Sequence, residues 1–239
     1  MTHAASPLAR PRSAAWGFQC CALGDTSRVP PRVAAVCGLL TPLTSTVGWL
    51  VGGYAQPDEY SSLDDDISDL GALTASHPWL YNQIGANVTG LLVITFALGL
   101  WRAVSPDVLG RVGAGALLIV GLGGFLDGLF RLDCQGIDVR CENLSWHSEA
   151  HRMEGRFTTA AVIAAPIILA FAFRRLPKWR DTWIPTLAAI PASLVVGIAF
   201  SGLGNGAAVR ATTLTWFVWL AYTAFQLLRK AENRAATGL

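Results

Sequence analysis

Long apolar runs separated by shorter polar segments dominate the pattern along the chain. Each of six such runs approaches the roughly 20 residues that a membrane-spanning helix requires. They lie at about Val33–Tyr54, Trp79–Leu100, Val112–Phe130, Phe157–Phe173, Trp183–Leu203 and Thr212–Leu228. The pattern therefore predicts an all-α, polytopic membrane protein, built as a bundle of six transmembrane helices.

Composition agrees with this pattern. The chain of 239 residues is 52% hydrophobic and only 14% charged, whereas an ordinary soluble domain carries about 25% charged residues. The chain lacks the charge that a water-facing surface needs, so membrane lipids are its expected surroundings. Nucleic acid is not an expected partner, because the 18 Lys and Arg residues form no dense basic cluster with interleaved aromatic residues.

The chain divides into three parts. Residues 1–28 are rich in Pro, Ala and Arg and show no periodic pattern, so we expect a disordered leader there or a mis-assigned start. Residues 29–230 form the predicted six-helix transmembrane domain, and residues 231–239 a short cytoplasmic tail.

The distribution of Lys and Arg predicts the orientation of the bundle. Six spans put both termini on one side of the membrane, and that side receives thirteen of the 18 basic residues. They are Arg10, Arg12, Arg28, Arg32, Arg102, Arg111, Arg174, Arg175, Lys178, Arg180, Arg229, Lys230 and Arg234. By the positive-inside rule, we expect a cell-membrane protein whose N- and C-termini are both cytoplasmic.

The first segment on the opposite side, Ala55–Pro78, is acidic, and its residues Asp65, Asp66 and Asp69 spell DDxxD. Class I terpene synthases use this pattern to hold magnesium and diphosphate, together with a second metal-binding motif that this sequence lacks. Short patterns of acids also arise by chance in an acidic loop. We therefore interpret the match as accidental.

The second outward segment, Arg131–Arg156, contains Cys134 and Cys141 in the stretch "CQGIDVRC". Disulfides persist on the oxidising side of a membrane. A thiolate metal pair is the alternative, but six intervening residues are not a usual zinc spacing. The favoured reading is a structural disulfide that fixes the outer end of the third span.

The same segment contains "SWHSEAHRMEG", in which His147, His151 and Glu154 follow one another at intervals of four and three residues. On a helix these side chains share one face. They could bind a divalent metal ion or hold a general base and its orienting partner. Ser145 is a suitable N-cap for this helix. The alternative is an exposed amphipathic first turn with solvated charges.

Three further charged residues are candidates for a site. Asp127 lies within or at the edge of the third span, where an acid is costly and usually faces a polar cavity. Asp133 follows it, and Arg131 could simply neutralise either acid. Arg210 opens the sixth span and could anchor the helix at the interface, pair with loop acids or clamp an anionic group of a ligand.

Four stretches carry a family resemblance. They are "YSSLDDDISDLGA" after the first span, "GLFRLDC" closing the third, "SWHSEAH" entering the fourth and a Gly-rich turn with Arg210 opening the sixth. In order and spacing the chain resembles the DUF998 family of bacterial and archaeal integral membrane proteins. Carried over by position, the resemblance points to Asp66, Ser68, Asp133, His147, His151 and Arg210. Since the biochemistry of that family is undefined, the resemblance implies an architecture and a candidate site, but no reaction.

The first functional hypothesis is a membrane-embedded enzyme, a hydrolase or an acid–base cyclase, acting on a lipid-like or isoprenoid substrate. The expected catalytic residues are Asp66, Asp133, His147 and His151. Ser68, Asp127 and Arg210 would contact the substrate, and His147, His151 and Glu154 would hold any divalent metal. An Asp/His site in a membrane bundle resembles that of intramembrane hydrolases such as alkaline ceramidases, by analogy only.

The second hypothesis is a non-catalytic membrane protein, namely an accessory subunit, a sensor or a small transport protein. The same Asp, His and Arg side chains would then form a structural polar network at the outer end of the bundle. The chain shows no internal repeat, which argues against the transporters that are built from inverted repeats.

Overall fold

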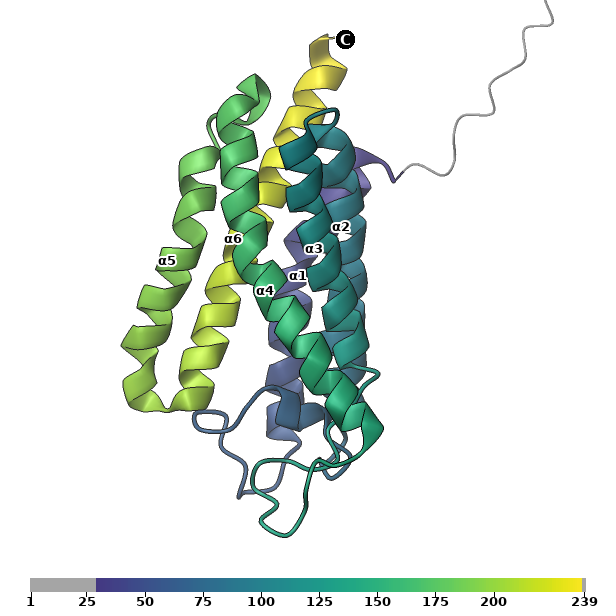
Figure 1. Ribbon diagram of the computed structural model, residues 1–239, viewed down its shortest axis with the longest axis vertical. Helices are drawn as coiled ribbons and strands as arrows, with labels where there is room; N and C mark the ends of the chain where they lie inside the picture. The colour runs from purple at the N-terminus through teal and green to yellow at the C-terminus, as the bar shows by residue number, and fades with distance from the viewer. Residues whose placement is uncertain (1–28, 238–239) are drawn as a thin grey trace, which may run out of the picture.

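The computed structural model describes residues 29–237 and contains six long helices that run side by side (Figure 1). They are α1 (Pro31–Tyr54), the π-helix η2 (Leu80–Val88) continuing into α2 (Thr89–Val104), α3 (Val108–Asp127), α4 (Trp146–Arg175), α5 (Trp183–Phe200) and α6 (Asn205–Thr237). Short 3-10 helices occur at η1 (Ser68–Gly71), η3 (Pro177–Trp179) and η4 (Ser201–Leu203). The described residues contain no β-strand, so the all-α prediction is confirmed. The predicted leader, residues 1–28, lies outside the described part of the chain.

Several of these helices have the length and composition of membrane spans. Five qualify within the described residues: Pro31–Tyr54, Leu80–Val104, Val108–Asp127, Trp146–Arg175 and Trp183–Leu203. The sixth apolar run lies within the longer helix α6. Large apolar side chains cover the outside of the bundle; Val195, for example, is 66% exposed and Ile198 is 73% exposed. An apolar exterior of this extent is incompatible with water and suits lipid, so the chain is a membrane protein.

Local sequence signals explain where the helices begin. α1 starts at Pro31, whose missing N–H costs nothing in the first turn. The Asp107 carboxylate caps α3 by accepting a hydrogen bond from the Gly110 N–H at 2.6 Å. The Ser145 hydroxyl accepts from the Ser148 N–H at 3.2 Å, which confirms the predicted N-cap. α4 therefore begins 11 residues before the apolar run that starts at Phe157, and its first turns are polar.

Glycines allow the helices to approach closely. A Cβ on Gly48 of α1 would lie 2.2 Å from the Gly85 Cα of η2, and a Cβ on Gly90 of α2 would lie 2.4 Å from the Phe125 backbone N of α3. Small residues at helix contacts are typical of membrane bundles, in which packing rather than water drives association. These contacts fix η2 and α2 between α1 and α3.

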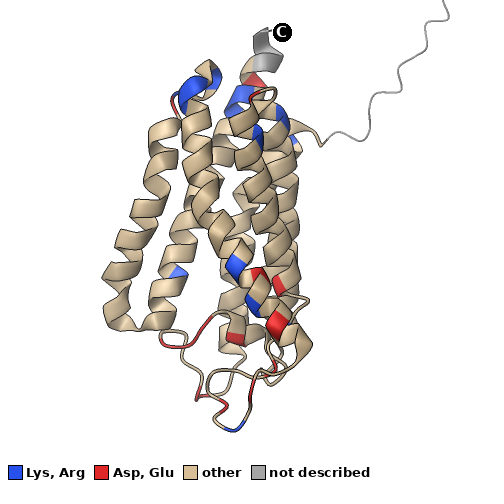
Figure 2. Ribbon diagram, viewed as in Figure 1, with Lys and Arg blue, Asp and Glu red and all other residues tan. Residues whose placement is uncertain are grey.

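The bundle has a main hydrophobic core and an uneven distribution of charge. The large, fully buried side chains Phe96, Leu100, Leu169, Phe173 and Leu220 of α2, α4 and α6 belong to this core. Figure 2 shows many of the Lys and Arg at the end near the C-terminus, whereas Asp and Glu lie mainly at the opposite end, in and near the two long loops, together with some Arg. The acidic end therefore holds the candidate site, and the positive-inside rule predicts that this end is extracytoplasmic.

The two long loops cover the acidic end as one unit. The backbone N–H of Leu73 donates to the Leu132 carbonyl at 2.9 Å, and the Gly136 N–H donates to Asp69 Oδ2 at 3.1 Å. The side chains of Gln135 and Gln56 are also hydrogen-bonded, at 3.0 Å. These bonds join the loop between α1 and η2 to the loop between α3 and α4.

The DDxxD acids take part in these loop contacts separately. Asp65 Oδ2 accepts from the Ser61 N–H at 2.8 Å, Asp66 Oδ1 accepts from Asn205 at 3.3 Å, and Asp69 binds Gly136. Three acids held by three different partners do not form a diphosphate-metal site, in agreement with an accidental match.

Replacing Asp69 by asparagine is expected to raise stability at neutral pH. Burial raises the pKa of Asp69, and the nearby carboxylates of Asp66 and Asp65 act in the same direction, while the Gly136 N–H opposes them. The folded state therefore disfavours the ionised form, so its penalty grows as the pH rises above the unfolded-state pKa of about 4. Asparagine keeps an oxygen acceptor for Gly136 and removes the charge.

Thermal unfolding of the two proteins between pH 4 and pH 8 tests this expectation. The melting temperature of Asp69→Asn should exceed that of the parent by a few degrees at pH 8, and the difference should shrink as the pH falls toward 4. Asp58→Asn is the control, because Asp58 is an exposed acid of the same loop. A variant that is less stable than the parent at pH 8, with the difference vanishing toward pH 4, would show that the ionised carboxylate is needed.

Candidate functional site

The π-helix η2 directs a tyrosine toward the end of α3. Its wide turns bring Tyr81 to the inner side of the bundle, where the phenol donates a hydrogen bond to Asp127 Oδ2 at 2.9 Å. A Cβ on Gly128 would lie only 2.1 Å from Asn87 Oδ1, so the chain must have glycine after Asp127 for η2 to pack this closely. π-Helical turns are often found at functional sites.

His151 of α4 contacts the same carboxylate from the other side. Its Nδ1 lies 2.9 Å from the Phe130 carbonyl oxygen and 3.4 Å from Asp127 Oδ1. Because a carbonyl oxygen can only accept a hydrogen bond, Nδ1 carries the proton. In the neutral ring, Nε2 then has a free lone pair that can accept a proton or bind a metal ion.

Glu154 lies one turn further along α4. Thr158 donates to Glu154 Oε1 at 2.5 Å. The facing residue on α3 is Gly123, where a Cβ would lie 1.7 Å from Thr158 Oγ1 and 2.6 Å from Glu154 Oε1. Only glycine at this position lets α3 and α4 pack with both polar side chains between them.

These side chains form one cluster, which we call the Asp127 cluster: Tyr81, Asp127, His151 and Glu154. One ligand atom each from Asp127, His151 and Glu154 lies within 4.8 Å of the other two. The side chains of Asp127 and His151 are 19% and 14% exposed. Two carboxyl groups, an imidazole and a phenol are thus gathered where α3, α4 and η2 meet.

The Asp127 cluster borders a cavity of about 540 Å³. Tyr81, Asp127 and Glu154 form part of its wall, while His151 contacts Asp127 but does not itself line the cavity. The loop between α1 and η2 contributes Asp66, Ile67 and Ser68. The apolar part of the wall comes from several helices and includes Val93, Val120, Val162, Ile190, Leu194 and Phe217. The wall is therefore mainly apolar, with its carboxyl groups contributed by Asp66, Asp127 and Glu154 and with hydroxyl groups such as those of Ser45, Ser193 and Thr212 among the apolar side chains.

A buried hydroxyl also faces this cavity. Ser193 of α5 is 4% exposed and lines the wall. Within the described part of the chain, its Oγ has no hydrogen-bond partner. Since a buried hydroxyl without a partner is costly, Ser193 is suited to bind a polar group of a ligand.

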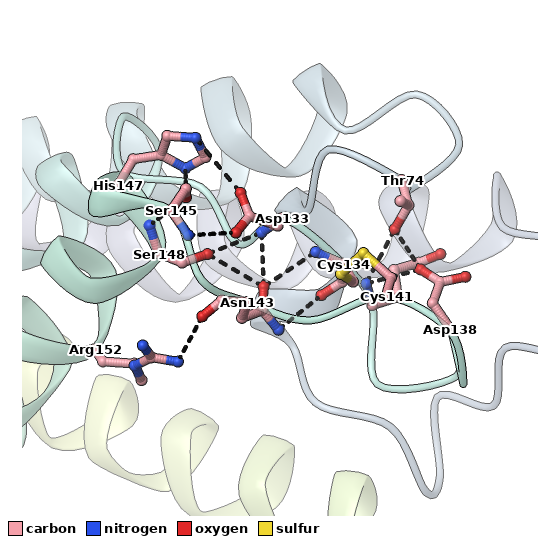
Figure 3. Close-up of a disulfide and its surroundings, with 11 residues drawn as sticks. Thr74, Asp133, Cys134, Asp138, Cys141, Asn143, Ser145, His147, Ser148 and Arg152 are labelled. Atoms are coloured by element: carbon pink, nitrogen blue, oxygen red, sulfur yellow. Dashed lines mark hydrogen bonds and ion pairs between the residues drawn. A yellow bond between two sulfur atoms is a disulfide. The ribbon is translucent and has the colours of Figure 1, made fainter.

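A second polar cluster lies beside the disulfide (Figure 3). We call it the Asp133 cluster: Asp133, Asn143, Ser145, His147 and Ser148. Asp133 Oδ2 accepts from the Ser145 N–H at 2.9 Å, and Asp133 Oδ1 lies 3.5 Å from His147 Nε2. The Ser145 hydrogen bonds, more than the nearby imidazole, hold the pKa of Asp133 below its usual value.

The contacts of the Asp133 cluster bind a loop to the start of α4. Asn143 Oδ1 accepts from the backbone N–H groups of Asp133 and Cys134 at 2.7 and 3.0 Å. His147 Nδ1 lies 2.7 Å from the Arg131 carbonyl oxygen. Cys134 and Cys141 form the predicted disulfide, with Cα atoms 5.9 Å apart. The Asp133 cluster and the disulfide thus hold this loop against the start of α4, which is a structural role.

Arg210 binds the loop that lines the cavity. The residue is 6% exposed, and its Nη1 donates to the Asp65 carbonyl oxygen at 2.7 Å. Its Nη2 donates to the Tyr60 hydroxyl at 2.5 Å, and the guanidinium lies over the Trp49 ring at 5.5 Å. Burial raises the pKa of Tyr60, and the Arg210 charge opposes this shift. Arg210 thereby fixes the first long loop against α1 and α6.

The residues proposed from the sequence thus fall into separate places. Asp133 and His147 pair in the Asp133 cluster, whereas His151, Glu154 and Asp127 meet in the Asp127 cluster. Asp66 and Ser68 lie in the cavity wall, but Asp66 has Asn205 as its hydrogen-bond partner and contacts neither histidine. The sequence did not single out Tyr81 or Thr158, because each is an uncharged residue near the start of a predicted span.

The helical bundle, its apolar exterior and the polar clusters at one end define a polytopic membrane protein. Residues 36–226 match the family model described as "Protein of unknown function (DUF998)", and the chain belongs to this family. The resemblance read from the four sequence stretches is thereby confirmed. No curated protein and no solved structure matches the chain.

Proposed function

We propose that this DUF998 protein is a membrane-embedded hydrolase that acts on a lipid-like substrate at the extracytoplasmic end of its bundle. The observation that carries the proposal is the cavity of about 540 Å³, whose wall is mainly apolar and includes the polar side chains of Tyr81, Asp127 and Glu154. Ligand sites generally combine an apolar lining with a few convergent polar groups. The apolar wall would hold an acyl or prenyl chain, and the carboxyl groups would face the linkage to be cleaved.

The Asp127 cluster supplies the groups that hydrolysis needs. Asp127 receives a hydrogen bond from Tyr81 and is approached by His151, so its orientation is fixed from two sides. Glu154, within reach of both Asp127 and His151, provides a second carboxyl group. Two carboxyl groups in one site can serve as proton acceptor and proton donor, the minimum for general acid–base catalysis. Asp127 and Glu154 are the catalytic residues of this proposal, and His151 and Tyr81 position Asp127.

The composition of the cavity wall favours hydrolysis over cyclisation. Loop residues Asp66 and Ser68 share the wall with side chains of the membrane helices. In this proposal water would arrive from the loop side and an apolar chain from the bilayer. A cyclase must instead exclude water from its reactive intermediate. The unpartnered hydroxyl of Ser193 offers a further contact for a polar group of the substrate.

Reconstitution of the full chain in nanodiscs with a total bacterial lipid extract tests the proposed reaction. Mass spectrometry should detect a time-dependent loss of one lipid class and the matching product. Asp127→Asn and Glu154→Gln should each lower the rate about 100-fold or more, the usual range for losing an acid–base group. His147→Ala is the control, because His147 belongs to the Asp133 cluster; it should retain the rate if it remains folded.

A photoactivatable, long-chain lipid probe tests binding separately. A Cβ on Gly155 would meet nothing within 4 Å, and Gly155 lines the cavity, so Gly155→Phe should fill the cavity and reduce labelling. Gly202→Phe is the matched control, since a Cβ on Gly202 also meets nothing within 4 Å but Gly202 is outside the cavity wall. Labelling without turnover would indicate a lipid-binding protein rather than an enzyme. Equal labelling of both variants would contradict the assignment of the cavity.

A further inference from the structure

We infer that the Asp127 cluster binds a divalent cation of the zinc class through Asp127, His151 and Glu154. The inference rests on the proposed function for the location of the substrate. With the ion bound, Asp127 and Glu154 act as its ligands instead of as free acid–base groups, and the ion activates water. His151 and Glu154 are three residues apart on one face of α4, and Asp127 comes from the end of α3. A ligand atom from each lies within 4.8 Å of the others, and side-chain rotation would bring the three onto one ion.

The donor atoms fit a catalytic metal better than a structural one. One imidazole nitrogen and two carboxylate oxygens match the mixed His/carboxylate sets of catalytic zinc sites, which use three protein ligands and keep a position for water or substrate. Asp127 and Glu154 both line the cavity, so the remaining position would face the cavity. Metal-bound water loses a proton near neutral pH, which would supply the hydroxide for hydrolysis.

Each of the three side chains also has a second partner that orients it. The Phe130 carbonyl accepts from His151 Nδ1, the Tyr81 phenol donates to Asp127, and the Thr158 hydroxyl donates to Glu154. Such outer hydrogen bonds are characteristic of metal ligands, because they fix the histidine tautomer and the carboxylate orientation. Nε2 of His151 has the free lone pair that a metal requires, but Nδ1 is the nitrogen that lies 3.4 Å from Asp127 Oδ1, so the imidazole would have to turn on binding the ion.

The charge balance of the cluster gives an independent argument. Within the described residues, neither Asp127 nor Glu154 forms an ion pair with a Lys or Arg side chain; the contact with His151 is the ion pair that Asp127 makes. Two acids beside an apolar cavity are costly unless a positive charge accompanies them. A dication held between them would supply this charge.

The structure thus changes the ligand set expected from the sequence, in which His147 stood in the place now taken by Asp127. His147 has its own partners in the Asp133 cluster, namely Asp133 at 3.5 Å and the Arg131 carbonyl oxygen at 2.7 Å. Because His147 and His151 are one turn apart on the same helix, they form a matched pair for experiment.

Metal analysis of the purified full chain tests the inference. The protein would be stripped with a chelator, loaded separately with Zn²⁺, Co²⁺ or Mn²⁺, desalted and analysed by inductively coupled plasma mass spectrometry. We expect about one ion per chain in the parent and in His147→Ala, and about tenfold less in His151→Gln and in Asp127→Asn, because each lacks one of three ligands. Tyr81→Phe removes only an orienting hydrogen bond and should weaken metal binding about 10-fold to 100-fold.

The possible outcomes separate this inference from the proposed function. No uptake of any of the three ions by the folded parent would overturn the metal site, while lipid labelling and turnover would still support a metal-free hydrolase. Metal loss in His147→Ala with metal retained in Asp127→Asn would overturn the ligand set in favour of the other histidine. Metal binding without lipid labelling would support the site and contradict the proposed substrate. If His151→Gln does not fold, the Co²⁺ absorption spectrum and the Co²⁺ affinity of Tyr81→Phe are compared with those of the parent. An unchanged spectrum and affinity would contradict the inferred site.

Discussion

Replacing Gly48 by alanine is expected to lower the free energy of unfolding by about 3 kcal/mol, the upper part of the usual range for overpacking. The new Cβ would lie 2.2 Å from the Gly85 Cα and 2.4 Å from the Gly85 backbone N. Both atoms belong to the main chain of η2, so no side chain can rotate away. α1 and η2 would have to separate, and Tyr81, only four residues before Gly85, would move with η2.

Thermal unfolding in one detergent, followed by tryptophan fluorescence, measures this effect. Gly155→Ala is the matched control, because its Cβ would meet nothing within 4 Å, and its melting temperature should stay at or slightly above that of the parent. Equal melting temperatures for Gly48→Ala and Gly155→Ala would mean that α1 and η2 are not in close contact.

Replacing Arg210 by methionine is expected to cost about 3 kcal/mol, because two hydrogen bonds from a charged group are lost and their buried acceptors stay unpaired. Methionine keeps most of the apolar length of the side chain but cannot donate to the Asp65 carbonyl oxygen or the Tyr60 hydroxyl. The loop that carries Asp66 and Ser68 would then be held less firmly against α6, through the N–H groups of Gly206 and Ala207 and the Asn205 side chain. Limited proteolysis should cut the variant between residues 55 and 78 faster than the parent.

The control for this variant is Arg152→Met. Arg152 pairs with Glu149 at 2.6 Å, but both side chains are well exposed, at 43% and 53%. Exposed pairs contribute little, so a change of about 0.5 kcal/mol or less is expected. If Arg210→Met were as stable and as protease-resistant as Arg152→Met, Arg210 would be free to bind an anionic ligand, as the sequence first indicated.

The fold could be predicted from hydropathy because lipid-facing helices need long apolar runs. The first and fifth runs, Val33–Tyr54 and Trp183–Leu203, agree with the structure within two residues. The fourth run, Phe157–Phe173, marks only the apolar part of α4. The polar start of that helix was indicated by Ser145, whose capping signal is independent of hydropathy.

The site could be predicted only in part. Helical spacing brought His151 and Glu154 together, since their separation is local. Their partner Asp127 depends on the packing of α3 against α4 at Gly123, which no local pattern reveals. Tyr81 depends on a π-helical turn without a sequence signature. The pairing of His147 with Asp133 likewise follows from the path of a loop that the disulfide closes.

The length of α4 determines where the proposed chemistry would occur relative to the bilayer. Its 30 residues make a helix about 45 Å long, whereas the hydrocarbon layer is about 30 Å thick. The excess falls at the polar beginning of the helix, which runs obliquely along the bundle (Figure 1). His151 and Glu154 would therefore stand at the depth of the glycerol and ester groups. A bilayer lipid could reach them by tilting within its own leaflet, while its tails remain in the hydrocarbon.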